Sequence, residues 1–275
     1  MSVIRRHPLA AYFVLAYVFA WWTWPFVLLN PASAPMLPWS PIFAALIVLA
    51  ITEGRAGVRN LLRATFRWRV RPIWYLVALG LPIALWGMAA LLQTALGARP
   101  DPSYFSDFLL FPVTLLSTAI VKGPLTEEPG WRGFALPRML GRWAPLAASL
   151  ILGGIWLSWH LPLLLQDAGG AQRPFVPYLI VILALAVIVT WLWSAASRSV
   201  FIVILFHAAI NSAGSHVVPA FPTDDQTTVW WTFAVLIAGV AAAVTFTDAF
   251  RLSAEPSAVN GRPAVAPTVG ASAAG

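Results

Sequence analysis

The stretch Pro174 to Ser197 reads PFVPYLIVILALAVIVTWLWSAAS and contains no Asp, Glu, Lys or Arg. A helix needs about 20 mainly apolar residues to cross the hydrocarbon core of a bilayer, and this stretch is long enough. Inside hydrocarbon, every backbone N–H and C=O group must be satisfied within the protein, which favours a helix over an open strand. The stretch therefore predicts a transmembrane helix.

Six more uncharged stretches of spanning or near-spanning length flank it: Leu9 to Leu29, Met36 to Thr52, Ile73 to Gly97, Trp143 to Gln166, Ser199 to Thr223 and Gln226 to Thr247. An eighth, from Phe108 to about Met139, is apolar apart from five ionisable residues: Lys122, Glu127, Glu128, Arg132 and Arg138. We therefore predict an all-α fold, a multi-pass transmembrane helical bundle of about eight helices.

The composition agrees with a membrane protein and narrows its chemistry. The chain is 60% hydrophobic and 10% charged, with a mean hydropathy of +0.78, far from a soluble domain. It has no cysteine, which excludes disulfides, thiolate metal sites and a cysteine nucleophile. The net charge of +7 comes from arginines in short loops, which fits topology signals and contacts to anionic lipid. We expect no nucleic-acid partner.

Charge asymmetry between the loops predicts the orientation. With a cytoplasmic N-terminus, only Arg99 and Arg173 lie outside, whereas thirteen arginines lie inside, namely Arg5, Arg6, Arg55, Arg59, Arg63, Arg67, Arg69, Arg71, Arg138, Arg142, Arg198, Arg251 and Arg262. This excess follows the positive-inside rule. We therefore predict a cell-membrane protein with both termini cytoplasmic.

The loops are too short for a separate soluble domain. We predict one membrane domain over residues 1–252, with a motif core at 113–215, and a disordered cytoplasmic tail at 253–275, which is rich in Ala, Pro, Ser and Gly. Leu9 to Leu29 is long enough to be a retained span rather than a signal peptide. The basic segment Glu53 to Pro72 predicts an amphipathic helix along the inner leaflet.

Two adjacent glutamates within an apolar segment suggest function. An ionisable side chain at mid-bilayer costs roughly 2.5 to 3.5 kcal/mol on insertion scales, so such residues are usually functional or paired. Glu128 and Arg132 are four residues apart and can form a structural ion pair on one helix face, which leaves Glu127 free for chemistry. Pro129 and Gly130 predict an irregular backbone here. The alternative is that both glutamates only anchor a helix end.

Two histidines and an asparagine complete the buried polar set. His207 and Asn211 are spaced so that both side chains lie on one face of a helix. His160 interrupts an otherwise apolar helix. Each could instead be a hydrogen-bonded packing residue, but together with Glu127 and Glu128 they predict a single site. Counting residues along straight spans places His160 nearer the outer side of the membrane than Glu127 and His207. These residues can therefore meet in one site only if a helix ends or tilts differently from this count.

These residues carry a family resemblance. The chain resembles the CAAX-protease and bacteriocin-processing (CPBP or Abi) family of intramembrane proteases, which is marked by EExxxR, FxxxH and HxxxN on three helices. Here the motifs read Glu127-Glu128 with Arg132, Trp156 with His160, and His207 with Asn211. Trp156 replaces the commoner Phe, which we interpret as affecting packing more than chemistry.

The resemblance implies endopeptidase chemistry on a peptide or protein in or at the bilayer. The catalytic residues would be Glu127, Glu128, His160, His207 and Asn211. Glu127 would activate a water that His160 orients, and His207 with Asn211 would stabilise the oxyanion. A zinc ion held by Glu127, His160 and His207 is an open alternative, because two histidines and a carboxylate are ordinary zinc ligands. A proton-coupled transporter and a non-catalytic membrane adaptor also remain open.

Overall fold

The structure is a computed structural model that describes residues 3–30, 36–166 and 173–251; the predicted tail at 253–275 lies outside these ranges. Within them the regular elements are all helical, which confirms the all-α prediction. In chain order they are α1 (Val3–Arg6), α2 (Pro8–Trp21), α3 (Trp24–Leu29), α4 (Ser40–Thr52), α5 (Gly54–Thr65), α6 (Ile73–Ala95), α7 (Ser103–Ser106), η1 (Asp107–Leu110), α8 (Phe111–Val121), α9 (Pro124–Glu128), η2 (Pro129–Ala135), α10 (Leu136–Leu140), α11 (Pro145–Trp159), α12 (Leu161–Gln166), α13 (Phe175–Ala195), α14 (Val200–Ala220), α15 (Thr223–Val244) and α16 (Asp248–Arg251).

All eight predicted apolar segments are helical, but they differ in length. Five qualify as membrane spans by length and composition: Pro8–Val27, Ile73–Ala95, Phe175–Ala195, Val200–Ala220 and Thr223–Val244. A sixth candidate is the pair Phe108–Val121 and Pro124–Leu140, which is bent by 44°. The remaining two segments, α4 and α11, are shorter apolar helices. The chain is thus a multi-pass helical membrane protein in which two segments are too short to qualify as full spans.

The bend in the sixth candidate lies at Gly123. Its φ of 110° is in the left-handed region, which is far more accessible to glycine than to other residues. The Gly123 carbonyl accepts hydrogen bonds from the backbone N–H groups of Thr126 and Glu127, at 2.8 and 2.7 Å. Chain direction therefore changes immediately before the glutamate pair.

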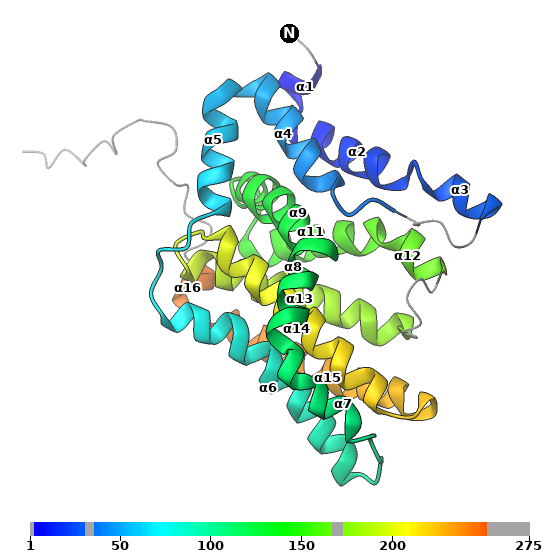
Figure 1. The fold of residues 1–275 in the computed structure, drawn as a ribbon. Coiled ribbons are helices and arrows are strands. Elements are labelled where there is room, and N and C mark those ends of the chain that lie inside the picture. Colours follow the sequence, from blue (N-terminus) through cyan, green and yellow to red (C-terminus); the bar gives the residue numbers. More distant parts are fainter. Residues whose placement is uncertain (1–2, 31–35, 167–172, 252–275) are drawn as a thin grey trace, which may run out of the picture.

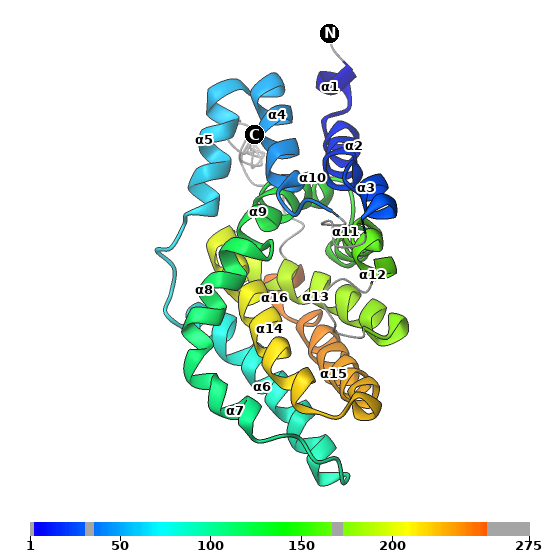
Figure 2. The ribbon, with the colours of Figure 1, turned by 45° about the vertical axis from the view of Figure 1, so that its right-hand side comes forward.

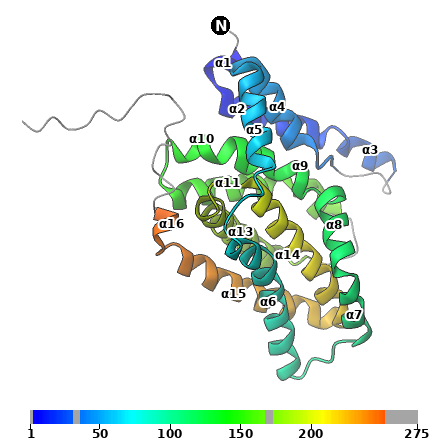
Figure 3. The ribbon, with the colours of Figure 1, turned by 60° about the vertical axis from the view of Figure 1, so that its left-hand side comes forward.

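The centre of the bundle is α14, which packs against α6 and α8, while α13 packs against α11 and α15. Figures 1 and 2 show α14 between α6 and α13. In Figure 3 the N-terminal helices α1 to α5 lie at one end of the molecule, next to α9 and α10. Helices from distant parts of the sequence therefore meet around the motif-bearing segments.

The predicted amphipathic helix is present but shorter than expected. It forms α5 and ends at Thr65 rather than continuing to Pro72. Two hydrogen bonds hold the following residues in a non-helical path: Ser199 Oγ donates to the Arg67 carbonyl at 2.6 Å, and the Tyr75 hydroxyl donates to the Trp68 carbonyl. These contacts end the helix at Thr65, although the amphipathic sequence pattern continues to Pro72.

The irregular backbone predicted at Pro129-Gly130 is a π-helix, η2, which separates α9 from α10. Proline has no N–H to donate to the preceding turn, which favours a departure from regular α-helical bonding. Such π segments are frequent at functional sites. Nearly all of η2 is buried, so this departure lies inside the protein.

Candidate active site

Glu127 lies at the end of α9 and is only 3% exposed. Its Oε2 accepts a hydrogen bond of 2.8 Å from the indole N–H of Trp156 on α11. No described group donates a hydrogen bond to its Oε1. A buried carboxylate with one fixed and one free oxygen is suited to accept a proton from a bound water.

Glu128 forms the predicted ion pair with Arg132, and both side chains are 1% exposed. Arg132 Nη1 lies 3.1 Å from each carboxylate oxygen of Glu128. The guanidinium also lies over the Trp156 ring, 4.9 Å from its centroid. Glu128 Oε1 is in addition 2.7 Å from Nδ1 of His207 on α14. A buried triad of carboxylate, guanidinium and imidazole therefore joins η2 to α14.

His160 lies at the break between α11 and α12. Its Nδ1 is 2.8 Å from the carbonyl oxygen of Trp156. Because a carbonyl only accepts, Nδ1 carries the proton, and Nε2 is the acceptor in the neutral ring. Because α11 and α12 are separate helices that meet at His160, counting along one straight span does not apply to this residue.

The four residues expected to contact substrate line one cavity of about 570 Å³. They are Glu127, His160, His207 and Asn211, from three segments of the chain. Asn211 is exposed to this cavity, and its side chain has no hydrogen-bond partner among the described residues. The structure thus brings these four predicted residues together around one cavity. Glu128 and Arg132 do not line this cavity and lie behind its wall.

The wall of the same cavity is mainly apolar, and its lining residues include two cations. Trp86, Trp156, Trp159, Tyr178, Trp230 and Phe233 contribute apolar wall, and Lys122 and Arg173 lie among the lining residues. An apolar cavity with a few convergent polar groups is the usual form of a ligand site. The lining residues suit a mainly apolar ligand with a polar reacting group.

The zinc alternative requires its three ligands to lie close together. Over the described ranges, no three His, Asp or Glu side chains are grouped so that they could hold a metal ion. Nδ1 of both His160 and His207 is already hydrogen-bonded, so only Nε2 of each ring is free to coordinate. Within the described ranges, the residues as they lie do not make a three-ligand site.

Trp156 makes a contact that the sequence did not predict. Its replacement of the commoner Phe was interpreted as affecting packing more than chemistry, but its indole N–H also donates a hydrogen bond to Glu127. A signal was available: Trp156 precedes His160 by four residues and so shares its helix face. The partner of the indole, on another helix, could not be read from that spacing.

Comparisons with known proteins found two similarities. Residues 108–213 match the family model described as Type II CAAX prenyl endopeptidase Rce1-like. A curated CAAX prenyl protease 2 of Methanococcus maripaludis is 29% identical over 116 residues, which are 40% of this chain and 41% of the relative. The chain therefore aligns with about two fifths of the length of that relative. The two comparisons confirm the resemblance to the CAAX-protease family, and the matched region contains all of the predicted site residues.

Proposed function

Because residues 108–213 resemble the CAAX prenyl endopeptidases, we propose that this chain is an intramembrane endopeptidase. It hydrolyses a peptide bond of a peptide or protein in or at the bilayer. The observation that carries the proposal is the convergence of Glu127, His160, His207 and Asn211 on one cavity. A transporter or a packing role requires no such pairing of a base with candidate oxyanion donors.

In the proposed reaction a water bound between Glu127 and His160 attacks the substrate carbonyl carbon. The free Oε1 of Glu127 accepts the proton of this water, and Nε2 of His160 accepts its second hydrogen bond and so orients it. Trp156 holds Oε2 at 2.8 Å, which fixes the carboxylate for this transfer. Glu127 then returns the proton to the nitrogen of the leaving amine.

The oxyanion is stabilised from α14. His207 donates from Nε2 in its doubly protonated form, in which Nδ1 donates to the Glu128 carboxylate 2.7 Å away. The Asn211 amide, one turn further along the same face, supplies the second donor. Glu128 and Arg132 thus act through His207 and contact no substrate.

The proposal is tested by cleavage of a membrane-peptide library by the purified full-length protein and Glu127→Gln. Loss of a general base typically costs about 10²- to 10⁴-fold in rate, so we expect cleavage by the variant to fall at least about 100-fold. Glu53→Gln is the matched control, because Glu53 is an exposed glutamate that pairs with Arg138, and neither residue lines the cavity. It should cleave at the wild-type rate.

Each reaction is repeated with a strong chelator. Cleavage that survives chelation supports the water activated by Glu127, whereas loss on chelation favours a metal-dependent enzyme that uses the same residues. Two results contradict the proposal: the Glu127→Gln variant cleaves as fast as the wild type, or the folded wild type cleaves no peptide. Either result leaves the transporter and adaptor hypotheses.

A further inference from the structure

Three rows of side chains run along α5. One row, Gly57, Leu61 and Thr65, is buried against α4 and η2. The other two rows face away from this contact. They define an arginine stripe (Arg55, Arg59, Arg63) and an apolar stripe (Val58, Leu62, Phe66), each with the four-residue spacing of a single helix face.

The arginine stripe is exposed, and none of its guanidinium groups is paired with a described carboxylate. The local sequence offers no acid to neutralise it: Glu53 is the first acidic residue of the chain, and the next is Asp101. Glu53 itself is paired with Arg138. Three positive charges therefore point away from the protein without internal compensation.

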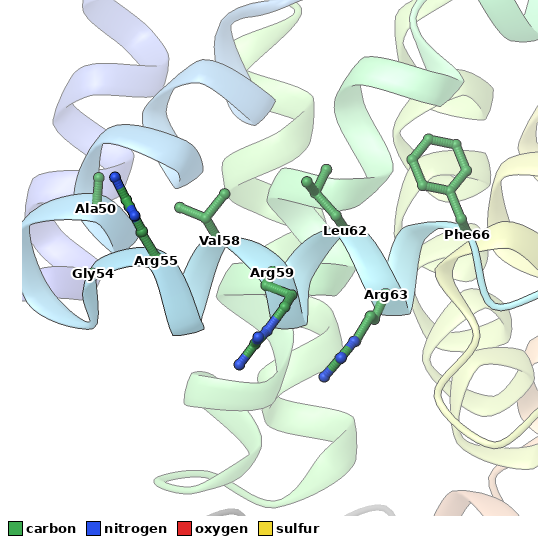
Figure 4. Close-up of a pocket in the computed structure, with 8 residues that line it drawn as sticks. All are labelled: Ala50, Gly54, Arg55, Val58, Arg59, Leu62, Arg63 and Phe66. Carbon is green, nitrogen blue, oxygen red and sulfur yellow. The ribbon is translucent and has the colours of Figure 1, made fainter.

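The apolar stripe runs beside these charges, and two of its three residues are open, whereas Val58 is half-buried against the core. Leu62 is 41% exposed and Phe66 is 59% exposed. The two stripes border a groove of about 620 Å³ that begins at Ala50 on α4. Figure 4 shows Val58, Leu62 and Phe66 along one side of the helix, and Arg59 and Arg63 extending from the other.

We propose that this face of α5 is a docking surface for anionic phospholipid headgroups. A helix with apolar side chains beside a row of Lys or Arg is the form that lies in the membrane interface. The guanidinium groups bind the phosphate groups, since planar bidentate donors suit phosphate oxygens. The apolar stripe enters the acyl boundary beneath them. The surface lies on the side of α5 away from η2, so it is separate from the cavity and does not rest on the proposed reaction.

The test uses energy transfer from α5 to labelled lipid. The chain lacks cysteine, so Asn60→Cys, at an exposed position of α5, can carry a donor dye at one defined place. The full-length protein is reconstituted in nanodiscs that hold acceptor-labelled phosphatidylglycerol or acceptor-labelled phosphatidylcholine at equal mole fraction. Near-surface attraction to anionic lipid by three arginines predicts at least about a fivefold local enrichment of phosphatidylglycerol.

Three further variants separate the effect of charge from the effects of folding and of apolar contact. Replacing all three residues of the arginine stripe with Gln should reduce the enrichment to about one. The control removes the same charge elsewhere, with Arg6→Gln, Arg71→Gln and Arg142→Gln at exposed positions, and should retain the preference. Phe66→Gln should lower transfer from both lipids without changing their ratio.

Two results overturn the proposal. One is equal transfer from both lipids in the wild type. The other is an undiminished preference in the stripe variant, with its thermal unfolding unchanged, because either result means that these arginines do not select the headgroup. The measurement needs no cleavage, so failure of the proposed protease function leaves its outcome unaffected.

Discussion

Among single residues, Trp156 makes the most contacts with the other residues of the candidate site. Its indole N–H donates to Glu127 and its carbonyl oxygen contacts Nδ1 of His160. Its ring lies 5.3 Å from the His207 ring in an edge-to-face arrangement, and Arg132 lies over it. A phenylalanine could supply the ring contacts but not the hydrogen bond. Trp156 is therefore a positioning residue in the proposed site.

Trp156→Phe should lower kcat for cleavage by about tenfold and change KM little. A hydrogen bond to a charged group contributes roughly 1.5 to 3 kcal/mol, and here its loss frees Glu127 to rotate. Steady-state kinetics on a cleaved peptide measure this split. Trp193→Phe is the control, because the buried Trp193 indole N–H has no partner among the described residues. An unchanged kcat in a folded Trp156→Phe protein would exclude the positioning role.

Among the elements, η2 determines how closely the helices approach the site. Gly130 lies against the backbone of Pro41 near the start of α4, where a Cβ would come within 2.6 Å of the Pro41 carbonyl group. Backbone cannot move aside as a flexible side chain can. The π-helix and this close approach together fix the segment that carries Arg132.

Gly130→Ala should therefore lower the apparent melting temperature of the reconstituted protein. Overpacking a closely fitted position costs typically about 1 to 3 kcal/mol. Gly154→Ala on α11 is the matched control, because a Cβ there meets nothing within 4 Å, and alanine favours a helix by up to about 1 kcal/mol. Equal melting temperatures for Gly130→Ala and the wild type would show that the contact with Pro41 is loose.

For the whole molecule, the exposed surface fits a lipid environment. Large apolar side chains are exposed on several of the spans, including Leu76 at 69%, Leu91 at 67% and Val235 at 68%. In water such a surface would promote aggregation, whereas lipid solvates it. The molecule as a whole is a helical membrane protein, and its orientation remains a prediction from the loop arginines.

Cysteine labelling measures that orientation. In intact cells an impermeant maleimide should label Arg99→Cys, in a predicted outer loop, and should label Asn60→Cys only after permeabilisation. Both positions are exposed, and the native chain has no cysteine to label. The reverse pattern would contradict the positive-inside prediction that both termini are cytoplasmic.

The sequence by itself determined the eight apolar helices, the ion pair of Glu128 and Arg132, the irregular backbone at Pro129-Gly130 and the family resemblance. These features depend on neighbours along the chain: the transfer free energy of a segment, a four-residue spacing, or a proline without an N–H. Local information is sufficient for them. The structure agrees on the helices, the ion pair and the irregular backbone, and the comparisons agree on the resemblance.

Only the tertiary structure decided which segments are too short to qualify as full spans and where α5 ends. It also showed that α11 ends at His160 and that Trp156 donates a hydrogen bond to Glu127. It also separated the residues that line the cavity from Glu128 and Arg132 behind it. These features depend on contacts between residues far apart in sequence. Such contacts arise from the packing of one helix on another, which the hydropathy of a segment does not specify.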